Sequence, residues 1–408
     1  MKPETAAIYK RGAFILIPLT AIGLRFCVYA VGKSTPRTYP DPVTVGQPDP
    51  ELQRQLDLAI ASAEHEKMAR KRAAAIPTAA PGSSSDVIAA GVPLPDAVAV
   101  DDKNVYWMST TSGAIQAAPR VGGPAVTLTK GHKMLFPRHS QVLAVAGGNV
   151  YFATRDGRGY GAVLRVPAGG GDAEPLTADL EGITSVAARG KDVVFTRAAT
   201  GASRDPDGNP TGGLYRVGAK GEEPKLLVPL ERPCASALDG KAAFAADQQT
   251  IVGVPVAGGE PERLVRSPSR LGCALVADDK DVYYVVPGED SVMRAPKDGS
   301  GASVFAVQRR RPSALALDGD FVYSLTESAP QALGEMGTVY RTRRGAREGS
   351  TALVTDEVGL NGLGAAGGGV FYTRYDEIEA DGKVVRVAAP ATSAAGSASA
   401  RPRPVTGP

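Results

Sequence analysis

The sequence predicts an all-β fold, a seven-bladed β-propeller, on the basis of three observations. A short apolar burst that ends near an aromatic residue returns seven times along the chain. The bursts are spaced by about 44 residues on average, which is within the range of propeller-blade repeats. Glycine (48) and proline (32) are both abundant among the 408 residues, as expected of a chain rich in turns. Sustained helical periodicity is absent from the repeats, which excludes an α-solenoid.

Each repeat contains the same elements in the same order. A strand-like run closed by a tight turn, such as "VAVDD" or "SALDG", comes first. The aromatic burst is the second strand, a run such as "GLYRVG" is the third, and six repeats add a fourth such as "AVTLT". The seven aromatic residues, of which Trp107 is expected to pack between blades, are Trp107, Phe152, Phe195, Phe244, Tyr284, Tyr323 and Tyr372.

The seventh repeat lacks a fourth strand, and the segment before the first repeat can supply it. Residues 85–90 lie in "SSDVIAAG", which has fourth-strand character and no other partner. A closing strand from the other terminus leaves no sheet edge open in the ring. The propeller is therefore predicted over residues 85–390, with strand 85–90 completing blade 7 and with Val87 and Ile88 contributing apolar contacts.

Residues 1–31 are predicted to be a signal peptide or a hydrophobic transmembrane helix that acts as a signal anchor. Three basic residues precede an apolar run over residues 12–31, which is typical of export or insertion signals. Small residues permit cleavage after Ala30. The run is also long enough to span a bilayer, although Arg25 would then lie inside it. Both alternatives stay open.

The segments that flank the propeller have a different composition. Residues 32–84 are expected to be a Pro-rich linker that contains a helix over residues 50–75, because acidic residues lead and basic residues close that stretch. Residues 391–408 are small, polar and of low complexity, and the sequence predicts a disordered tail.

The repeat resembles the NHL and YWTD-type β-propellers, especially exported bacterial propellers whose blades carry a "VDDxxVYW…GxIxRxPxxGG" pattern. The stretch "VDDKNVYW" ends at Trp107, and "GAIQAAPRVGG" follows it. The resemblance implies the propeller fold over about residues 85–390 and leaves the function open, because such propellers serve many roles. With the N-terminal signal, it predicts a location in the bacterial cell envelope, as a periplasmic propeller anchored to the inner membrane or as a secreted protein.

The two faces of the predicted ring differ in their connections. The first-to-second and third-to-fourth turns share one face, termed the short-turn face, and are short and rich in Gly or Asp. Lys220 and Lys297 lie in such turns, and their replacement by Ala is expected to change stability by only about 0.5 kcal/mol. The second-to-third and blade-to-blade connections share the other face, termed the loop face. Their lengths vary, and variable loops on a rigid scaffold often carry binding sites.

Binding is therefore predicted on the loop face, within the long connections of blades 2, 3, 6 and 7. The candidate binding residues are Arg158, Tyr160, Arg204, Asp205, Asp207, Asn209, Glu335, Tyr375, Asp376 and Glu377. In the run Asp205–Asn209, two carboxylates and an amide alternate, as in a calcium-binding loop. Such a loop needs Gly at its sixth position, where this chain has Pro210, so the run is interpreted as a turn and not as a calcium site.

The composition argues against several kinds of partner and site. Lys and Arg (46) nearly balance Asp and Glu (43), which argues against a nucleic-acid partner. Three Cys and three His argue against a zinc site, and no catalytic triad, metal or cofactor is expected. Cys234 and Cys273 open neighbouring inner strands. Export permits a disulfide between them, but the usual distance between such strands and their difference in register argue against it, so the pairing stays open.

The sequence thus predicts a non-catalytic binding or scaffolding propeller, tethered to the membrane through residues 12–31 if these are uncleaved. Its partner is expected to be a protein, a peptide or a glycan. The alternative is a propeller enzyme, a lactonase-like hydrolase or a lyase with a metal at the channel mouth. The small apolar residues of the inner strands favour the first hypothesis over the second.

Overall fold

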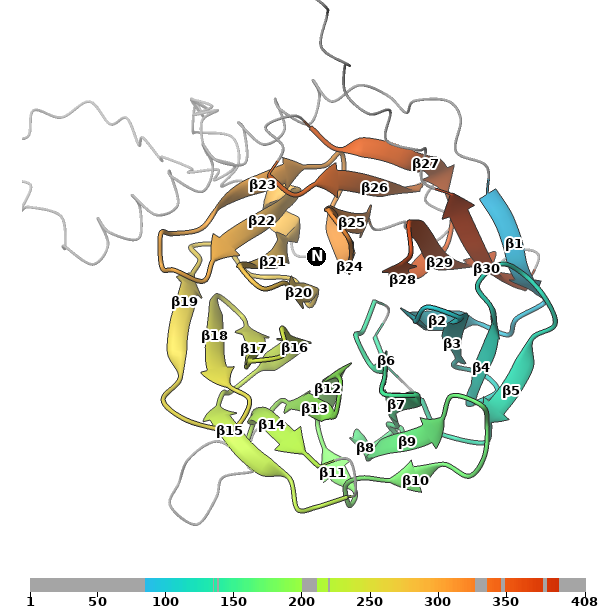
Figure 1. The fold of residues 1–408 in the computed structure, drawn as a ribbon, viewed down its shortest axis with the longest axis horizontal. Helices are drawn as coiled ribbons and strands as arrows, with labels where there is room; N and C mark the ends of the chain where they lie inside the picture. Colours follow the sequence, from blue (N-terminus) through green and yellow to red (C-terminus); the bar gives the residue numbers. More distant parts are fainter. Residues whose placement is uncertain are drawn as a thin grey trace, which may run out of the picture. The chain divides into compact units, whose positions relative to one another are not determined.

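The computed structural model describes residues 85–388 except 135, 138, 200–210, 219–220, 327–335, 346–348 and 377–379. Seven four-stranded antiparallel sheets form the blades of a ring around a central channel (Figure 1). The predicted seven-bladed propeller is confirmed. The predicted N-terminal hydrophobic helix, the linker with its helix and the C-terminal tail lie outside the described residues.

The blades follow one another around the ring, and each runs from the channel outward (Figure 1). Blade 1 contains β2 (Pro95–Val100), β3 (Asn104–Ser109), β4 (Ala114–Pro119) and β5 (Val126–Thr129). Blade 2 contains β6 (Leu143–Ala146), β7 (Asn149–Ala153), β9 (Val163–Pro167) and β10 (Glu174–Pro175). Blade 3 contains β12 (Ile183–Arg189), β13 (Asp192–Arg197), β14 (Gly213–Val217) and β15 (Lys225–Pro229). Blade 4 contains β16 (Pro233–Leu238), β17 (Ala242–Asp247), β18 (Thr250–Pro255) and β19 (Glu262–Arg266).

Blades 5, 6 and 7 complete the ring. Blade 5 contains β20 (Leu275–Ala277), β21 (Asp281–Val286), β22 (Ser291–Pro296) and β23 (Ser303–Val307), with the 3₁₀ turn η3 (Pro287–Glu289) between its second and third strands. Blade 6 contains β24 (Pro312–Asp318), β25 (Phe321–Thr326), β26 (Gly337–Arg343) and β27 (Thr351–Glu357). Blade 7 contains β28 (Leu360–Ala366), β29 (Gly369–Asp376), β30 (Asp381–Ala388) and β1 (Ser85–Ala90). A separate two-stranded sheet pairs β8 (Tyr160–Gly161) with β11 (Leu180–Glu181).

The core lies between the blades, because both sides of each second strand are covered by neighbouring sheets. Trp107 is fully buried, as predicted, and belongs to an apolar cluster that joins blade 1 to Phe371 of blade 7. Its indole Nε1 donates a hydrogen bond of 3.1 Å to Oε1 of Gln116. A buried indole with a satisfied donor contributes apolar area without leaving a polar atom unpaired.

The ring is closed by β1, as the sequence predicts. It pairs antiparallel with β30, from Ser85 opposite Val387 to Ala90 opposite Lys383. The expectation that both apolar residues enter the core is wrong, because Ile88 is 9% exposed whereas Val87 is 56% exposed. The pairing with β30 shifts register between Val87 and Ala89, and of the two apolar neighbours only Ile88 packs in the cluster between blades 7 and 1.

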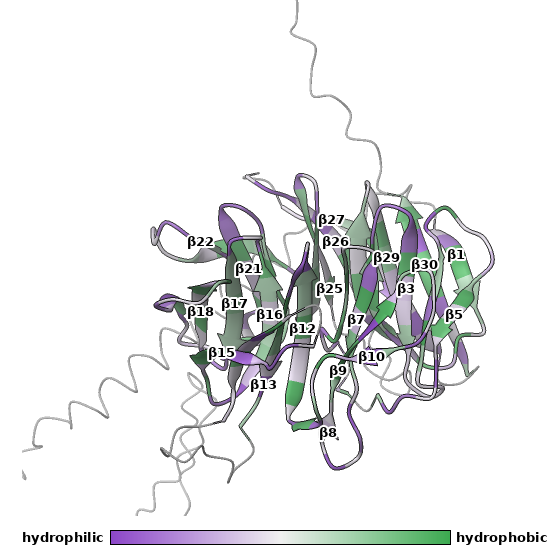
Figure 2. Cartoon of the chain, turned by 60° about the horizontal axis from the view of Figure 1, so that its bottom comes forward, coloured by the Kyte–Doolittle hydropathy of each residue, from purple (hydrophilic) through white to green (hydrophobic). Residues whose placement is uncertain are grey.

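Figure 2 shows the two faces from the side, with hydrophilic hairpin tips along the top and β8 at the bottom. On the short-turn face, partly buried ion pairs connect neighbouring blades. Lys297, in the third-to-fourth turn of blade 5, pairs with Asp239 in the first-to-second turn of blade 4. Arg344 of blade 6 pairs in the same way with Asp278 of blade 5. The short turns therefore connect the blades as well as reverse the chain.

Lys297 contradicts the expectation that its replacement is nearly neutral. Its side chain is 17% exposed, and its partner Asp239 is 8% exposed. The ammonium also donates to the Asp278 carbonyl and lies 4.7 Å from the centre of the Phe244 ring. Burial by itself would raise the pKa of Asp239, but hydrogen bonds from the Ala242 amide and from Lys297 hold it below its ordinary value.

Lys297→Ala is expected to lower the free energy of unfolding by about 2 kcal/mol, because it leaves the Asp239 carboxylate buried without its counter-charge. Chemical denaturation measures this change. The matched control is Lys191→Ala, an exposed lysine in a turn of the same face, which should shift stability by less than about 0.5 kcal/mol. Equal midpoints for the wild type and Lys297→Ala would contradict the role of this ion pair.

Candidate functional site

The loop of blade 2 presents an aromatic side chain on the loop face. Tyr160 is 42% exposed although it begins a strand, β8. The Arg158 guanidinium lies 5.9 Å from the centre of the Tyr160 ring, and the Tyr160 hydroxyl lies 3.5 Å from Oε2 of Glu181. An exposed tyrosine flanked by an arginine and a carboxylate combines residue types that often dominate protein interfaces.

This loop is ordered by the carboxylate of Asp156. Its Oδ1 accepts hydrogen bonds from the backbone amides of Arg158 (2.9 Å) and Tyr160 (3.0 Å). Its Oδ2 lies 3.2 Å from Nε of Arg158. Hydrogen bonds from these amides, that of Tyr160 most of all, hold the pKa of Asp156 below its ordinary value. The pairing of Tyr160 with Glu181 joins the loop to β11, so the Tyr160 backbone is held before any partner arrives.

Two other predicted binding residues, Tyr375 and Asp376, do not join this group. Tyr375 and Asp376 lie at the end of β29 in blade 7, and blade 1 separates them from blade 2 around the ring. Tyr375 is half-buried, and its backbone amide donates to the Gly359 carbonyl at 3.0 Å. Six predicted residues lie outside the described residues, namely Arg204, Asp205, Asp207, Asn209, Glu335 and Glu377.

A second candidate site is the central channel, a cavity of about 290 Å³ lined by the first strands of all seven blades. Small apolar residues such as Ala97, Ala187 and Ala316 make up most of its lining. His139 is the ionisable side chain among the described lining residues. It has a left-handed backbone with φ of 63°, a conformation that is uncommon for residues other than glycine.

The segment before β6 crosses the channel at its loop-face end. The Gln141 side chain donates from Nε2 to the Leu275 carbonyl (3.1 Å), and its Oε1 accepts from the Leu275 amide (3.3 Å). The Gln141 carbonyl accepts from the Val186 amide (2.7 Å). Nδ1 of His139 lies 2.8 Å from the Asn361 carbonyl oxygen. Residues 139–141 of blade 2 are thereby attached to blades 3, 5 and 7.

These channel residues were missed at the sequence level. The hydrogen bonds of Gln141 and His139 join positions 134 and 222 residues apart. No local pattern signals such contacts. The available signal was the unusual length of the connection between blades 1 and 2, which contains both His132 and His139.

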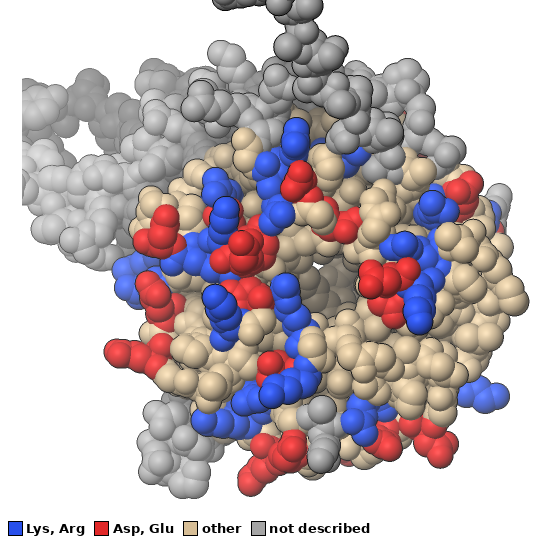
Figure 3. Space-filling model, in the orientation of Figure 1, with Lys and Arg blue, Asp and Glu red and all other residues tan. Residues whose placement is uncertain are grey.

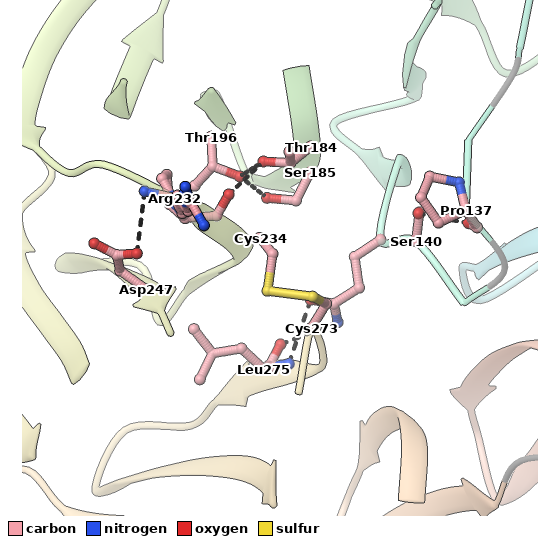
Figure 4. Close-up of a disulfide and its surroundings, with 12 residues drawn as sticks. Pro137, Ser140, Thr184, Ser185, Thr196, Arg232, Cys234, Asp247, Cys273 and Leu275 are labelled. Carbon is pink, nitrogen blue, oxygen red and sulfur yellow. Dashed lines mark hydrogen bonds between the residues drawn. A yellow bond between two sulfur atoms is a disulfide. The ribbon is translucent and has the colours of Figure 1, made fainter. Parts of the chain in front are cut away.

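Cys234 and Cys273 form a disulfide beside this crossing segment (Figure 4), with Cα atoms 5.1 Å apart. The sequence-based geometric objection to the pair is wrong. β20 begins only at Leu275, so Cys273 lies in the connection before the inner strand and can approach Cys234 of β16. Figure 4 shows the bridge above Leu275, with Ser140 to its right.

Two further expectations concern metals and membranes. Within the described ranges, no three His, Cys, Asp or Glu side chains come together in a group that could hold a metal ion. No helix of the described residues is long and apolar enough to cross a membrane, and residues 12–31 lie outside them.

Comparisons with known proteins address the fold. No protein-family profile matches the chain, and no curated protein matches it in sequence. A streptogramin B lyase structure is similar at a TM-score of 0.56 with 15% identity, over 76% of this chain and 99% of the lyase chain. A nidogen/laminin complex matches at 0.41 with 15% identity, over 55% of this chain and 84% of that one. A puromycin-hydrolyzing peptidase of Mycobacterium tuberculosis matches at a TM-score of 0.48 with 15% identity, over 69% of this chain and 49% of the peptidase chain.

The expectation that the chain is not an enzyme is corrected by the first of these comparisons. The lyase shares the propeller fold over nearly its whole length, so a propeller of this kind can carry an active site. At 15% identity the likeness establishes the fold alone. The propeller fold is therefore established, whereas the NHL or YWTD repeat type is not.

Proposed function

We propose that the chain is an exported propeller that recognises a protein, a peptide or a glycan with its loop face. The observation that carries this proposal is the exposed Tyr160 on a loop held by Asp156 and β11. A side chain that is ordered before binding loses less conformational entropy when a partner docks. Recognition at this face is compatible both with a binding role and with chemistry on the bound partner.

The Cys234–Cys273 disulfide supports export. Cys273 is exposed, and disulfides persist mainly in oxidising compartments outside the cytoplasm. The basic start and the apolar run over residues 12–31 support the same location, in the cell envelope of a bacterium or released from it. A reporter that is active only in the cytoplasm, fused to the C-terminus, tests this location: high reporter activity would contradict export.

Tyr160→Ala is expected to weaken partner binding by about thirtyfold, which corresponds to about 2 kcal/mol for the loss of a central aromatic contact. The partner is first captured from the native cell envelope with the full chain and then titrated against the variants. Arg158→Ala should weaken binding as well. Lys191→Ala, on the short-turn face, is the control and should leave affinity unchanged. Loss of affinity in Lys191→Ala with full affinity in Tyr160→Ala would mean that the opposite face binds the partner.

A further inference from the structure

The walls of the channel are the inner edges of seven first strands. The first strand of each blade has a partner on its outer side only, so alternate backbone N–H and C=O groups point toward the channel. Unpaired strand edges are ready-made hydrogen-bonding templates. In β20 the channel-facing groups are those of Leu275, and in β12 they include the amide of Val186, since Gln141 reaches both.

Gln141 shows which chemistry these edges accept. Its primary amide lies against β20 and makes both hydrogen bonds of an amide pair, one donated to the Leu275 carbonyl and one accepted from the Leu275 amide. A side-chain amide from blade 2 thus substitutes for the backbone of a neighbouring strand. Because backbone groups alternate along a strand, the edge groups of Ala188 and Ala277, two residues nearer the short-turn face, have the same orientation as those of Val186 and Leu275. Both alanines line the cavity.

The described walls of the cavity carry His139 as their one ionisable side chain, and the cavity opens on the short-turn face. No described lining residue is Asp, Glu, Lys or Arg. Residues 139–141 cross the loop-face end, whereas the opposite end is visible as a hollow at the centre of the short-turn face in Figure 3, inside a rim of Lys, Arg, Asp and Glu. A charged ligand would lose its hydration in this channel without gaining a counter-charge from Asp, Glu, Lys or Arg. A neutral ligand would not incur this cost.

We propose that the channel is a binding site for small neutral carboxamides, entered from the short-turn face, in which the ligand amide pairs with free strand edges as the Gln141 side chain does with Leu275. The aliphatic part of the ligand packs against the small apolar residues of the wall. This site lies inside the ring and is independent of the recognition proposed for the loop face.

Three molecules of the same length test the proposal on the unmodified full chain. Hexanamide carries a neutral amide, hexanoate a negative charge and hexylammonium a positive charge at neutral pH. Ligand-observed NMR titrations should show that hexanamide binds at least tenfold more tightly than either charged molecule. Equal binding of all three, or no binding of hexanamide, would overturn the proposal without reference to any variant.

A pair of glutamine variants tests the pairing mode. Gln141→Ala removes the internal amide and frees the Leu275 edge, so hexanamide should bind about threefold or more tightly than to the wild type. The matched control is Gln249→Ala, because the Gln249 side chain donates to the Pro268 carbonyl (2.8 Å) at an exposed position outside the channel. An unchanged affinity in Gln141→Ala, with its fold verified by circular dichroism, would contradict pairing of the ligand amide at the Leu275 edge.

A pair of alanine variants tests the route of entry. Ala188→Trp narrows the channel near the short-turn face and should weaken hexanamide binding at least tenfold. Ala198→Trp places the same bulk at a half-buried alanine after β13, on the loop face, and should leave the affinity unchanged. The opposite result would assign entry to the loop face and overturn this part of the proposal.

Discussion

Deleting residues 1–92 is expected to lower the free energy of unfolding by about 5 kcal/mol relative to deleting residues 1–80. The longer deletion removes β1 and the burial of Ile88, which contributes about 2 kcal/mol. It also removes the hydrogen bonds between β1 and β30, each with a net contribution of about 1 kcal/mol. The amide of Val92, which donates to the Gly382 carbonyl at 2.9 Å, is lost as well. Chemical denaturation of the two truncated chains measures the difference.

A pair of neighbouring substitutions provides the control for the deletion. Ile88→Ala should lower the free energy of unfolding by about 2–4 kcal/mol, because it leaves a cavity between blades. Val87→Ala, at a side chain that is 56% exposed, should change it by less than about 0.5 kcal/mol. Loss of β1 also leaves β30 as an open edge, so the shorter chain should self-associate. Equal melting temperatures for the two truncated chains would contradict closure of the ring by β1.

Cys273→Ser is expected to lower the free energy of unfolding by about 3 kcal/mol under oxidising conditions. The disulfide joins residues 39 positions apart, and a cross-link over such a loop restricts the unfolded chain by an amount of this order. The double variant Cys234→Ser/Cys273→Ser should be no less stable than the single variant, because both remove the same bond. Chemical denaturation with and without a dithiol reductant measures each effect.

Two controls accompany this comparison. Cys27→Ser, at a cysteine outside the described residues, should leave the unfolding of the propeller unchanged. The reductant should destabilise the wild type and leave the double variant unaffected. A wild type that unfolds at the same denaturant concentration with and without the reductant would show that the two cysteines are not bridged.

Within the candidate site, the sequence located Arg158 and Tyr160 correctly on an exposed loop. Loop length is visible in a single chain, and exposed Tyr and Arg are recognisable residue types. It did not indicate that Asp156 organises this loop, because an aspartate in a turn is common and only the hydrogen bonds distinguish it. It also assigned Tyr375 and Asp376 to the loop face of blade 7, and they lie there at the end of β29, with blade 1 between them and Tyr160. Their part in binding stays a prediction.

Three features of the fold follow from the sequence alone: the number of blades, the four-strand order within each blade and the origin of the closing strand. These features depend on local alternation, on turn residues and on a repeat period, all of which act over a few tens of residues. Which residues meet across the ring is visible only in the folded chain. Gln141 reaches Leu275, Lys297 reaches Asp239, and Cys273 reaches Cys234. Each contact depends on the position of one blade relative to another, which is set by packing between blades and leaves no periodic trace in the chain.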